Sequence, residues 1–335
     1  MTGPLNMADV AALAGVSKAT VSRVLSGAPG VSDETRTRIK ALVKELSYVV
    51  SPDASRLSRR ANGRIAVVMP HTTSWFFGAV LAGILPVLRD AGLDALVYQV
   101  ADGREFFADL PAQRQVDAVI VVAFPVTGFE RRQLDLLGVP VVVAGGALLD
   151  HPNVRIDDVA AARQAVTHLI RSGHDRIAMI NAAVTPERPY SPPTDRLQGY
   201  RTALAGAGLP ADPDLVVELP WSGTMGAHAM DRLLSLERPP TAVFGFSDEV
   251  AVGALRSLRR AGIPVPRAVS VVGIDDHPIA ELCDLTTVRQ PAEEQGTEAA
   301  RLALSLLGGG DPPQNPHVTL PTHLVIRATT GPLDP

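Results

Sequence analysis

Apolar side chains recur at helical spacing near the start of the chain, in two short stripes separated by a few polar residues. We expect a tight turn between the stripes, because Gly15 permits a sharp or left-handed backbone. Ser17 is suited to cap the second of the two helices. The pattern therefore predicts a helical hairpin with the two stripes packed together. The stripes are Val10, Leu13 and Ala14 at i, i+3 and i+4, then Val21, Val24 and Leu25.

A third helix is predicted after the hairpin. Ser32 is a suitable N-cap, and Asp33 and Glu34 lie in the first turn, where the helix dipole favours negative charge. Residues 6–46 therefore form three short helices with no strand between them. The apolar positions of the third helix are Ile39, Leu42, Val43 and Leu46.

From residue 65 onward, short apolar runs alternate with amphipathic helical segments. Strands buried on both faces of a parallel sheet have this pattern, which predicts a doubly wound α/β fold. Eight such runs are many for one open sheet, so we expect two α/β lobes, with ligands bound beyond the carboxyl ends of the strands. The runs span residues 65–69, 95–100, 118–124, 139–145, 176–182, 215–220, 242–246 and 270–274.

Length and composition limit the class of protein. A chain of 335 residues that is 46% hydrophobic can bury a sizeable core and form two or three domains. We find no apolar run long enough for a membrane helix and no secretory signal, and therefore expect a cytoplasmic location. The single cysteine, Cys283, excludes an internal disulfide and a multi-cysteine metal site. We expect neither a cofactor nor a metal.

Charge is distributed unevenly along the chain. Residues 1–64 contain three lysines and seven arginines against five acidic residues, a formal charge of +5. The remaining residues carry −9 of the total of −4. A basic N-terminal region on an acidic body indicates a polyanionic partner for that region alone.

The polar face of the second helix has two interpretations. At about 100° per residue, its polar and small side chains occupy one arc opposite Val21 and Val24. This arc is either the solvated face of a helical hairpin or a surface that grips DNA, and the basic charge of the region favours DNA. The arc contains Lys18, Ala19, Ser22 and Arg23.

The ordered motifs of the chain resemble those of the lactose-repressor (LacI/GalR) family of bacterial transcription regulators. In the N-terminal region the resemblance is carried by DVAALAGVSKATVSRVLSG, VSDETRTRI and ELSY. In the body it is carried by IAVVMP, DAVIVV, HLIRSGHDRIAMI, DRLQGYRTAL, FGFSDEVAVGALRSLRRAGIPVP, VSVVGIDD, LTTVRQP and LPTHLVIR. The resemblance covers nearly the whole chain.

The family implies a helix-turn-helix DNA-binding domain at residues 1–50, a hinge at 51–63 and a body at 64–335 that binds an effector and forms a homodimer. The body resembles a two-lobed periplasmic sugar-binding protein. The first lobe is expected at about 64–158 and 290–318, and the second at about 159–289 and 319–335. The chain ends soon after LVIRATTGPLDP without a heptad tail, so we expect a dimer and not a tetramer.

The resemblance assigns DNA contacts to the second helix, which would lie in the major groove of a pseudo-palindromic operator. Lys18, Ala19 and Arg23 would face base edges, and arginine to guanine is the strongest of these contacts. Polar groups at the start of the helix would hold phosphates or act as caps. These are Ser17, Thr20 and Ser22.

In the family, the hinge forms a helix on DNA, and a leucine from each subunit enters the minor groove. Leu57 lies nine residues after Tyr48, the spacing that the family uses, so the resemblance assigns it this role. Val50 stands where the family usually has proline, and Pro52 follows instead. The hinge helix is therefore expected to begin at a shifted position.

The resemblance also assigns an effector site between the lobes. Arg196 and Asp275 are the polar clamps, since a guanidinium and a carboxylate can each bind two adjacent hydroxyls of a sugar. An ion pair without a ligand is the alternative for these two residues. Trp75, Phe76 and Trp221 would provide flat apolar walls, with core packing as the alternative for Phe76 and its neighbour Phe77. Ser247 also belongs to the predicted site and stands where the family usually has asparagine.

Three functions from different classes are compatible with this organisation. The first is a DNA-binding repressor controlled by a small effector, most simply a sugar or sugar derivative. The second is a binding protein for a transported sugar, which the basic N-terminal region and the missing signal oppose. The third is an α/β enzyme with a DNA-binding region, but the sequence has no Walker loop, G-x-G-x-x-G, H-E-x-x-H or nucleophile elbow.

Overall fold

The structure is a computed structural model that divides into two compact units, Met1–Asn62 and Gly63–Pro335. Leu57 and Pro52 of the predicted hinge, and Tyr48 and Val50 just before it, lie outside the described residues. We call the two units the head and the body. The structure describes residues 7–25, 28–46, 62–100, 106–107, 115–124, 126–146, 148, 150–183, 191–222, 224–308 and 315–333.

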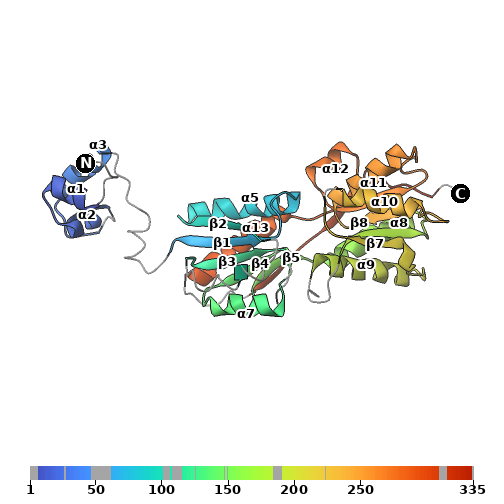
Figure 1. Cartoon of the computed structure of the whole chain (residues 1–335), viewed down its shortest axis with the longest axis horizontal. Helices are drawn as coiled ribbons and strands as arrows, with labels where there is room; N and C mark the ends of the chain where they lie inside the picture. Colours follow the sequence, from blue (N-terminus) through green and yellow to red (C-terminus); the bar gives the residue numbers. More distant parts are fainter. Residues whose placement is uncertain are drawn as a thin grey trace. The chain divides into compact units, whose positions relative to one another are not determined.

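The head contains the three predicted helices, α1 (Met7–Ala14), α2 (Lys18–Leu25) and α3 (Asp33–Glu45) (Figure 1). Both predicted caps are present. Ser17 Oγ accepts a hydrogen bond from the Thr20 amide at 3.1 Å, and Ser32 Oγ accepts one from the Thr35 amide at 3.4 Å. Each cap satisfies a backbone donor that the first turn of a helix leaves without an intrahelical partner.

A small apolar core joins the three head helices. It is built on Val10, Val21, Val24 and Ile39, each no more than 1% exposed. The prediction that Leu13 holds the hairpin together is wrong, because its side chain is 61% exposed. Helix α1 buries Val10, Ala11 and Ala14 instead, and Leu13 lies about 100° around the helix from the centre of that face.

The first lobe of the body is a six-stranded sheet in the order β11-β5-β4-β3-β1-β2, with every neighbouring pair parallel. Helices α5 (Trp75–Asp90) and α13 (Ala292–Leu307) cover one face, and α7 (Gly128–Leu136) covers the other (Figure 1). The strands are β1 (Arg64–Met69), β2 (Asp94–Gln99), β3 (Ala118–Val122), β4 (Val141–Ala144), β5 (Asn153–Ile156) and β11 (His317–Leu320).

Helices α5 and α13 approach each other closely through two glycines. A Cβ atom at Gly83 of α5 would collide with the Glu293 carbonyl, and one at Gly296 of α13 would collide with the Val80 carbonyl. Any larger side chain at either position would therefore separate the helices. This contact fixes α13 against the first lobe although α13 follows the second lobe in the sequence.

The second lobe is also a six-stranded sheet, in the order β12-β10-β9-β8-β6-β7. All its neighbouring pairs are parallel except β10 and β12, which are antiparallel. Helices α8 (Asp158–Arg171) and α9 (Pro192–Gly206) pack on one face, and α10 (Met225–Leu234) and α11 (Asp248–Arg260) pack on the other. The strands are β6 (Ile177–Ala182), β7 (Val216–Leu219), β8 (Ala242–Gly245), β9 (Ser270–Asp275), β10 (Thr286–Arg289) and β12 (His323–Val325). A 3-10 turn (Pro213–Leu215) precedes β7, and the short helix α12 (Pro278–Leu282) follows β9.

All eight predicted strands are present, and the expectation of two α/β lobes is confirmed. The sequence prediction did not include β5, β10, β11 and β12, which are only three or four residues long and contain polar side chains. The chain passes between the two sheets three times, after β5, after β10 and after β11. In the described part of the chain, none of the helices has both the length and the apolar character needed to cross a membrane.

Candidate functional site

The outward face of α2 presents the head residues that were predicted to contact DNA. Lys18, Ala19, Ser22 and Arg23 are exposed, whereas Val21 and Val24 of the same helix are buried in the head core. The arrangement leaves two cationic side chains and a small apolar one on a single arc. Such an arc can meet phosphates and base edges in a major groove.

Hydroxyl groups gather at the N-terminus of α2. Ser17 Oγ and Thr20 Oγ1 lie 2.9 Å apart, and Ser17 Oγ also caps the Thr20 amide. Because the N-terminal amides of a helix attract anions, this corner of the head is suited to hold a phosphate. These hydrogen bonds also satisfy the capping interpretation, so the phosphate role stays a prediction.

The body contains a cavity of about 320 Å³ between its two lobes. Its lining comes from loops that follow strands in both sheets and from the N-terminal ends of helices α5, α9, α11 and α13. Five of the six residues predicted for the effector site line it: Phe76, Arg196, Trp221, Ser247 and Asp275. Both lobes therefore supply side chains to one cavity of a size typical for small-molecule sites.

Arg196 is held in the cavity wall by three contacts. Its Nε donates to Asp158 Oδ1 at 2.7 Å, and its Nη1 donates to the Phe246 carbonyl at 2.5 Å. The guanidinium carbon lies 4.6 Å from the centre of the Phe246 ring. Arg196 is only 5% exposed, so it forms a buried ion pair and also lines the cavity. Within the described residues its Nη2 has no hydrogen-bond partner, which leaves donors for a ligand.

Asp275 enters the cavity from the end of β9. Its backbone φ is +141° and that of Asp276 is +57°, both in a region that side chains other than glycine rarely adopt. Asp275 Oδ1 accepts a hydrogen bond from Gln290 Nε2 at 2.6 Å. Burial raises the pKa of the Asp275 carboxyl, and the charge of Asp248 raises it further, while Arg196 and the bond from Gln290 oppose the shift.

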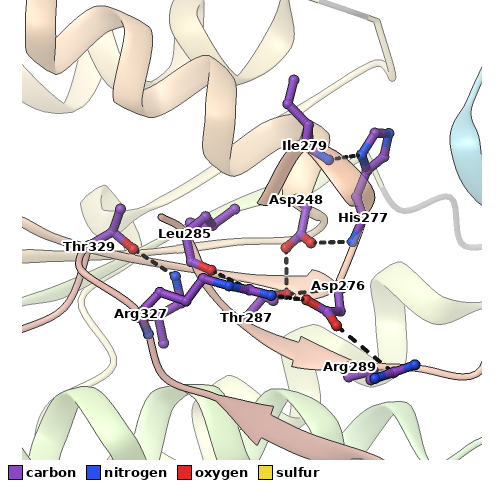
Figure 2. Close-up of polar contacts among 10 residues, drawn as sticks. Asp248, Asp276, His277, Ile279, Leu285, Thr287, Arg289, Arg327 and Thr329 are labelled. Atoms are coloured by element: carbon purple, nitrogen blue, oxygen red, sulfur yellow. Dashed lines mark hydrogen bonds and ion pairs between the residues drawn. The ribbon is translucent and has the colours of Figure 1, made fainter. Parts of the chain in front are cut away.

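Asp248, at the start of α11, supports the turn that carries Asp275. Its Oδ1 accepts from Thr287 Oγ1 at 2.6 Å, and its Oδ2 accepts from the His277 amide at 2.9 Å (Figure 2). The carboxylate lies directly over Gly273, where an added Cβ would collide with Asp248 Oδ1. Burial raises the pKa of Asp248, and the two hydrogen bonds work in the opposite direction. The two buried carboxyls, Asp248 and Asp275, therefore disfavour each other's charge.

Arg327 fixes the other side of the same turn. Its Nη2 donates to Asp276 Oδ1 at 2.7 Å and its Nη1 donates to the Leu285 carbonyl at 2.8 Å (Figure 2). On the opposite side of Asp276, Arg289 Nε lies 3.8 Å from Asp276 Oδ2, and the Arg289 side chain is mostly exposed. Sequence reasoning quoted the motif LVIR but assigned no role to Arg327. Arg327 follows β12, and the pairing of β12 with β10 is what brings it close to Leu285 and Asp276.

The aromatic walls differ in part from the prediction. The Trp221 ring stacks on His71 of the first lobe with centroids 4.8 Å apart, and both residues line the cavity. Trp75 does not line the cavity, and its ring lies 5.3 Å from that of His277. Phe76 lines the cavity because it lies about 100° further around α5 than Trp75. Phe77 combines both of its proposed roles, since it lines the cavity and packs in the first-lobe core.

Glu249 joins the two lobes at the edge of the cavity. Its Oε2 accepts from Ser74 Oγ at 2.9 Å, and its Oε1 accepts from the Trp75 amide at 3.2 Å. Sequence reasoning assigned the site role to Ser247 and overlooked Glu249. Ser247 lines the cavity, but its Oγ also caps α11 by accepting from the Val250 amide at 3.4 Å. The carboxylate two residues later makes the contact between the lobes.

Comparison with known proteins finds two family matches. Residues 6–51 match the bacterial regulatory proteins of the lacI family, and residues 166–330 match the periplasmic binding protein-like domain. The chain is 34% identical over 335 residues to the HTH-type transcriptional repressor CytR of Escherichia coli strain K12, covering 97% of this chain and 96% of that protein.

Two solved structures share the fold over nearly the whole chain. One is the complex of the transcriptional regulator CelR with cellobiose, which is 34% identical, with a TM-score of 0.72 and coverage of 97% of this chain and 99% of that one. The other is the lac repressor dimer bound to operator and the anti-inducer ONPF, which is 27% identical, with a TM-score of 0.86 and coverage of 98% and 100%. The likeness therefore includes head and body together.

Proposed function

Because the chain belongs to the lacI family of bacterial regulatory proteins, we propose that it represses transcription as a homodimer whose operator affinity is set by a small effector in the cavity. The observation that carries the proposal is that one chain contains both a DNA-binding type of head and a ligand-sized cavity. The head exposes a basic arc on α2, and the body has a cavity lined from both lobes. The cavity alone would also fit a sugar-binding protein, and the head alone would not explain control by an effector.

On the DNA side, Lys18, Ala19 and Arg23 read base edges in each half-site. Arg23 donates to guanine, and Ala19 offers apolar contact to a thymine methyl. The hydroxyls of Ser17, Thr20 and Ser22 hold phosphates and set the register. Leu57, outside the described residues, is proposed as the wedge in the minor groove. A two-fold dimer fits a pseudo-palindromic operator, and the operator-bound dimer of the lac repressor supports this arrangement.

On the effector side, the cavity suits a sugar or sugar derivative. Arg196 offers donors and Asp275 offers an acceptor, which together match the adjacent hydroxyls of a sugar ring. Trp221 and Phe76 offer apolar surfaces to the faces of that ring. The cellobiose complex of CelR supports this ligand class, because that protein shares 34% of its residues with this chain.

Coupling between the two functions follows from the placement of the cavity. A ligand that contacts side chains from both lobes binds best to one arrangement of the lobes, so it shifts the population toward that arrangement. In the sequence, the predicted hinge directly precedes β1 of the first lobe, and this is why the proposal couples the two hinge segments of the dimer to the position of that lobe. Operator must change effector affinity by the same factor by which effector changes operator affinity.

The proposal includes a cytoplasmic location, where an operator is accessible. A sugar-binding protein without a transcriptional role is the competing function, and the basic head opposes it. The curated relatives that the chain matches are transcription regulators. An enzymatic role is not favoured by any catalytic motif in the sequence.

Selection of duplexes from a random pool, followed by titration of the selected duplex across salt concentrations, tests the proposal. We expect an enriched pseudo-palindrome that binds about a thousandfold or more tighter than random DNA. Affinity should fall steeply with salt, because phosphate contacts release counterions. Equal affinity for selected and random DNA would exclude a sequence-specific repressor.

A further inference from the structure

Gln295 is a buried polar residue in the cavity wall that the predicted site did not include. It lies on α13, the helix that packs against α5 of the first lobe, and its side chain is 0% exposed. The other buried residues of α13 include alanines, a glycine and a leucine. An amide in this apolar setting requires hydrogen-bond partners, or it destabilises the fold.

A chain of two hydrogen bonds connects Gln295 to the predicted clamp Asp275. Gln295 Nε2 donates to Gln290 Oε1 at 3.0 Å, and Gln290 Nε2 donates to Asp275 Oδ1 at 2.6 Å. Asp275 Oδ1 accepts this bond whether the carboxyl is ionised or carries its proton on Oδ2, so Gln290 presents its Nε2 to Asp275 and its Oε1 to Gln295. Gln295 must therefore present its own Nε2 to Gln290. Chemistry at Asp275 thus fixes the orientation of both amides.

This orientation leaves Gln295 Oε1 without a partner. Among the described residues it is one of two buried side-chain oxygens that accept no hydrogen bond, and the other, Asn181 Oδ1, does not belong to a cavity-lining residue. A buried acceptor without a partner is costly, whereas an apolar side chain of similar shape would avoid the cost. Because Gln295 lines the cavity, a ligand bound there is the candidate partner for this oxygen.

We propose that Gln295 is an effector-contacting residue whose Oε1 accepts a hydrogen bond from a hydroxyl or amino group of the effector. This role rests on the proposed function and adds a contact from the first lobe to those of Arg196 and Asp275 in the second. The bonds to Gln290 and Asp275 hold the Gln295 amide in place before the effector arrives. The effector therefore meets a fixed acceptor, and less freedom is lost on binding.

The charges of the cavity indicate which class of effector fits. Arg196 is the one lysine or arginine among the described lining residues, and Asp158 already neutralises it. Glu249 and Asp275 also line the cavity. A phosphorylated or carboxylated ligand would meet these acids without a free cation, so its burial would be unfavourable. The acceptors Gln295 Oε1 and Asp275 select an uncharged ligand that is rich in donors, such as an unphosphorylated sugar or nucleoside.

The test compares the full-length wild type with Gln295→Met, because methionine keeps the unbranched shape and has no strong acceptor. Thermal unfolding is measured without ligand and with cellobiose, D-ribose, adenosine, and the phosphate esters of ribose and adenosine. Gln198→Met is the matched control, because Gln198 is exposed on α9 and does not line the cavity.

We expect at least one uncharged probe to raise the wild-type Tm and no phosphate ester to do so. Gln295→Met should raise the Kd of that probe about tenfold, because one hydrogen bond to the probe is lost. Gln198→Met should leave the Kd unchanged. Gln295→Met removes an acceptor that has no partner, but it also leaves Gln290 Oε1 without its donor, so each probe is compared with the ligand-free Tm of the same variant.

Each contrary result has a separate meaning. Unchanged probe affinity in Gln295→Met overturns the contact. Stronger binding of a phosphate ester than of its parent overturns the ligand class. If no uncharged probe raises the wild-type Tm, the sugar part of the proposed function fails and the role of Gln295 fails with it, whereas a probe that binds the wild type and Gln295→Met equally overturns the Gln295 contact alone.

Discussion

Ser74 Oγ donates a hydrogen bond to Glu249 Oε2 at 2.9 Å, and this bond joins the first turn of α5 in one lobe to the first turn of α11 in the other. Ser74 is the N-cap residue of α5, but its hydroxyl makes no cap bond within its own helix. The Glu249 carboxylate takes over that role by accepting from the Trp75 amide at 3.2 Å. Closure of the cavity therefore supplies the cap that α5 lacks.

Replacing Glu249 by alanine should open the body. The variant loses two hydrogen bonds to a charged group between the lobes, which we expect to destabilise the closed arrangement by about 1 to 3 kcal/mol. Spin labels at Leu136→Cys and Glu237→Cys, one exposed position on each lobe, report the separation after Cys283 is replaced by serine. The distance distribution should shift to longer values in Glu249→Ala and stay unchanged in Glu218→Ala, an exposed glutamate on β7. Identical distributions in all three proteins would show that the contact does not hold the lobes.

Replacing Arg196 by alanine should abolish the effector response. The residue lies in the body, so operator binding without effector should stay within a few-fold of the wild type. The variant also leaves the buried Asp158 without its cation, at a cost of about 3 to 5 kcal/mol in the free energy of unfolding. The double variant Arg196→Met with Asp158→Asn removes both charges and separates stability from binding. A normal effector response in a folded Arg196 variant would exclude this residue as a clamp.

Stability should depend on pH through Asp275. Burial and the charge of Asp248 raise the pKa of Asp275 above the value in the unfolded chain. A raised pKa in the folded state means that the protonated form is favoured there. This stability is fully present below the unfolded pKa, near 4, and is lost as pH rises through the raised pKa.

Asp275→Asn should remove that dependence, because asparagine stays neutral. Unfolding by urea across pH 4 to 9 should give a free energy that falls less with rising pH in the variant than in the wild type. His71 and His277 titrate in both proteins, so the difference between the two curves reports Asp275 together with its effect on the neighbouring carboxyl of Asp248. Parallel curves would mean that Asp275 has the same pKa in the folded and unfolded states.

Replacing Arg23 by alanine should relax base preference at one position of each half-site. We expect a cost of about 1 to 3 kcal/mol for each lost contact to guanine. A panel of duplexes with single substitutions in the selected operator measures this preference by fluorescence anisotropy. Lys40→Ala, on the exposed surface of α3, should weaken all duplexes equally if it has any effect. If the base preference of Arg23→Ala is the same as that of the wild type, Arg23 contacts a phosphate and not a base.

The buried strands and the head helices were predictable because their residues are constrained by local pattern. Continuous valine and isoleucine runs, such as residues 118–122, indicate strands covered on both faces. The caps Ser17 and Ser32 act on amides three residues away, so their role is visible in the sequence. The strand Asn153–Ile156 was missed because its polar residues are buried by tertiary contacts, as in the bond from Asn153 to His317.

The site was only partly predictable for a similar reason. Arg196 and Asp275 belong to the motifs DRLQGY and GIDD, which carry the resemblance, but Glu249 and Gln295 gain their roles from partners far away in the sequence. Glu249 contacts residues 74 and 75, and Gln295 reaches Asp275 through Gln290. Phe76 lines the cavity as predicted and Trp75 does not, and this difference depends on where α5 begins, which a pattern locates only within a residue or two.

The central claim is that the head and the cavity are coupled in one chain. The most direct test is titration of the selected operator by the full-length protein, with and without a saturating concentration of the ligand found by thermal shift. We predict a change of at least about fivefold in operator Kd, and the same factor in ligand Kd when operator is bound. An operator affinity that does not change at saturating ligand would contradict the claim.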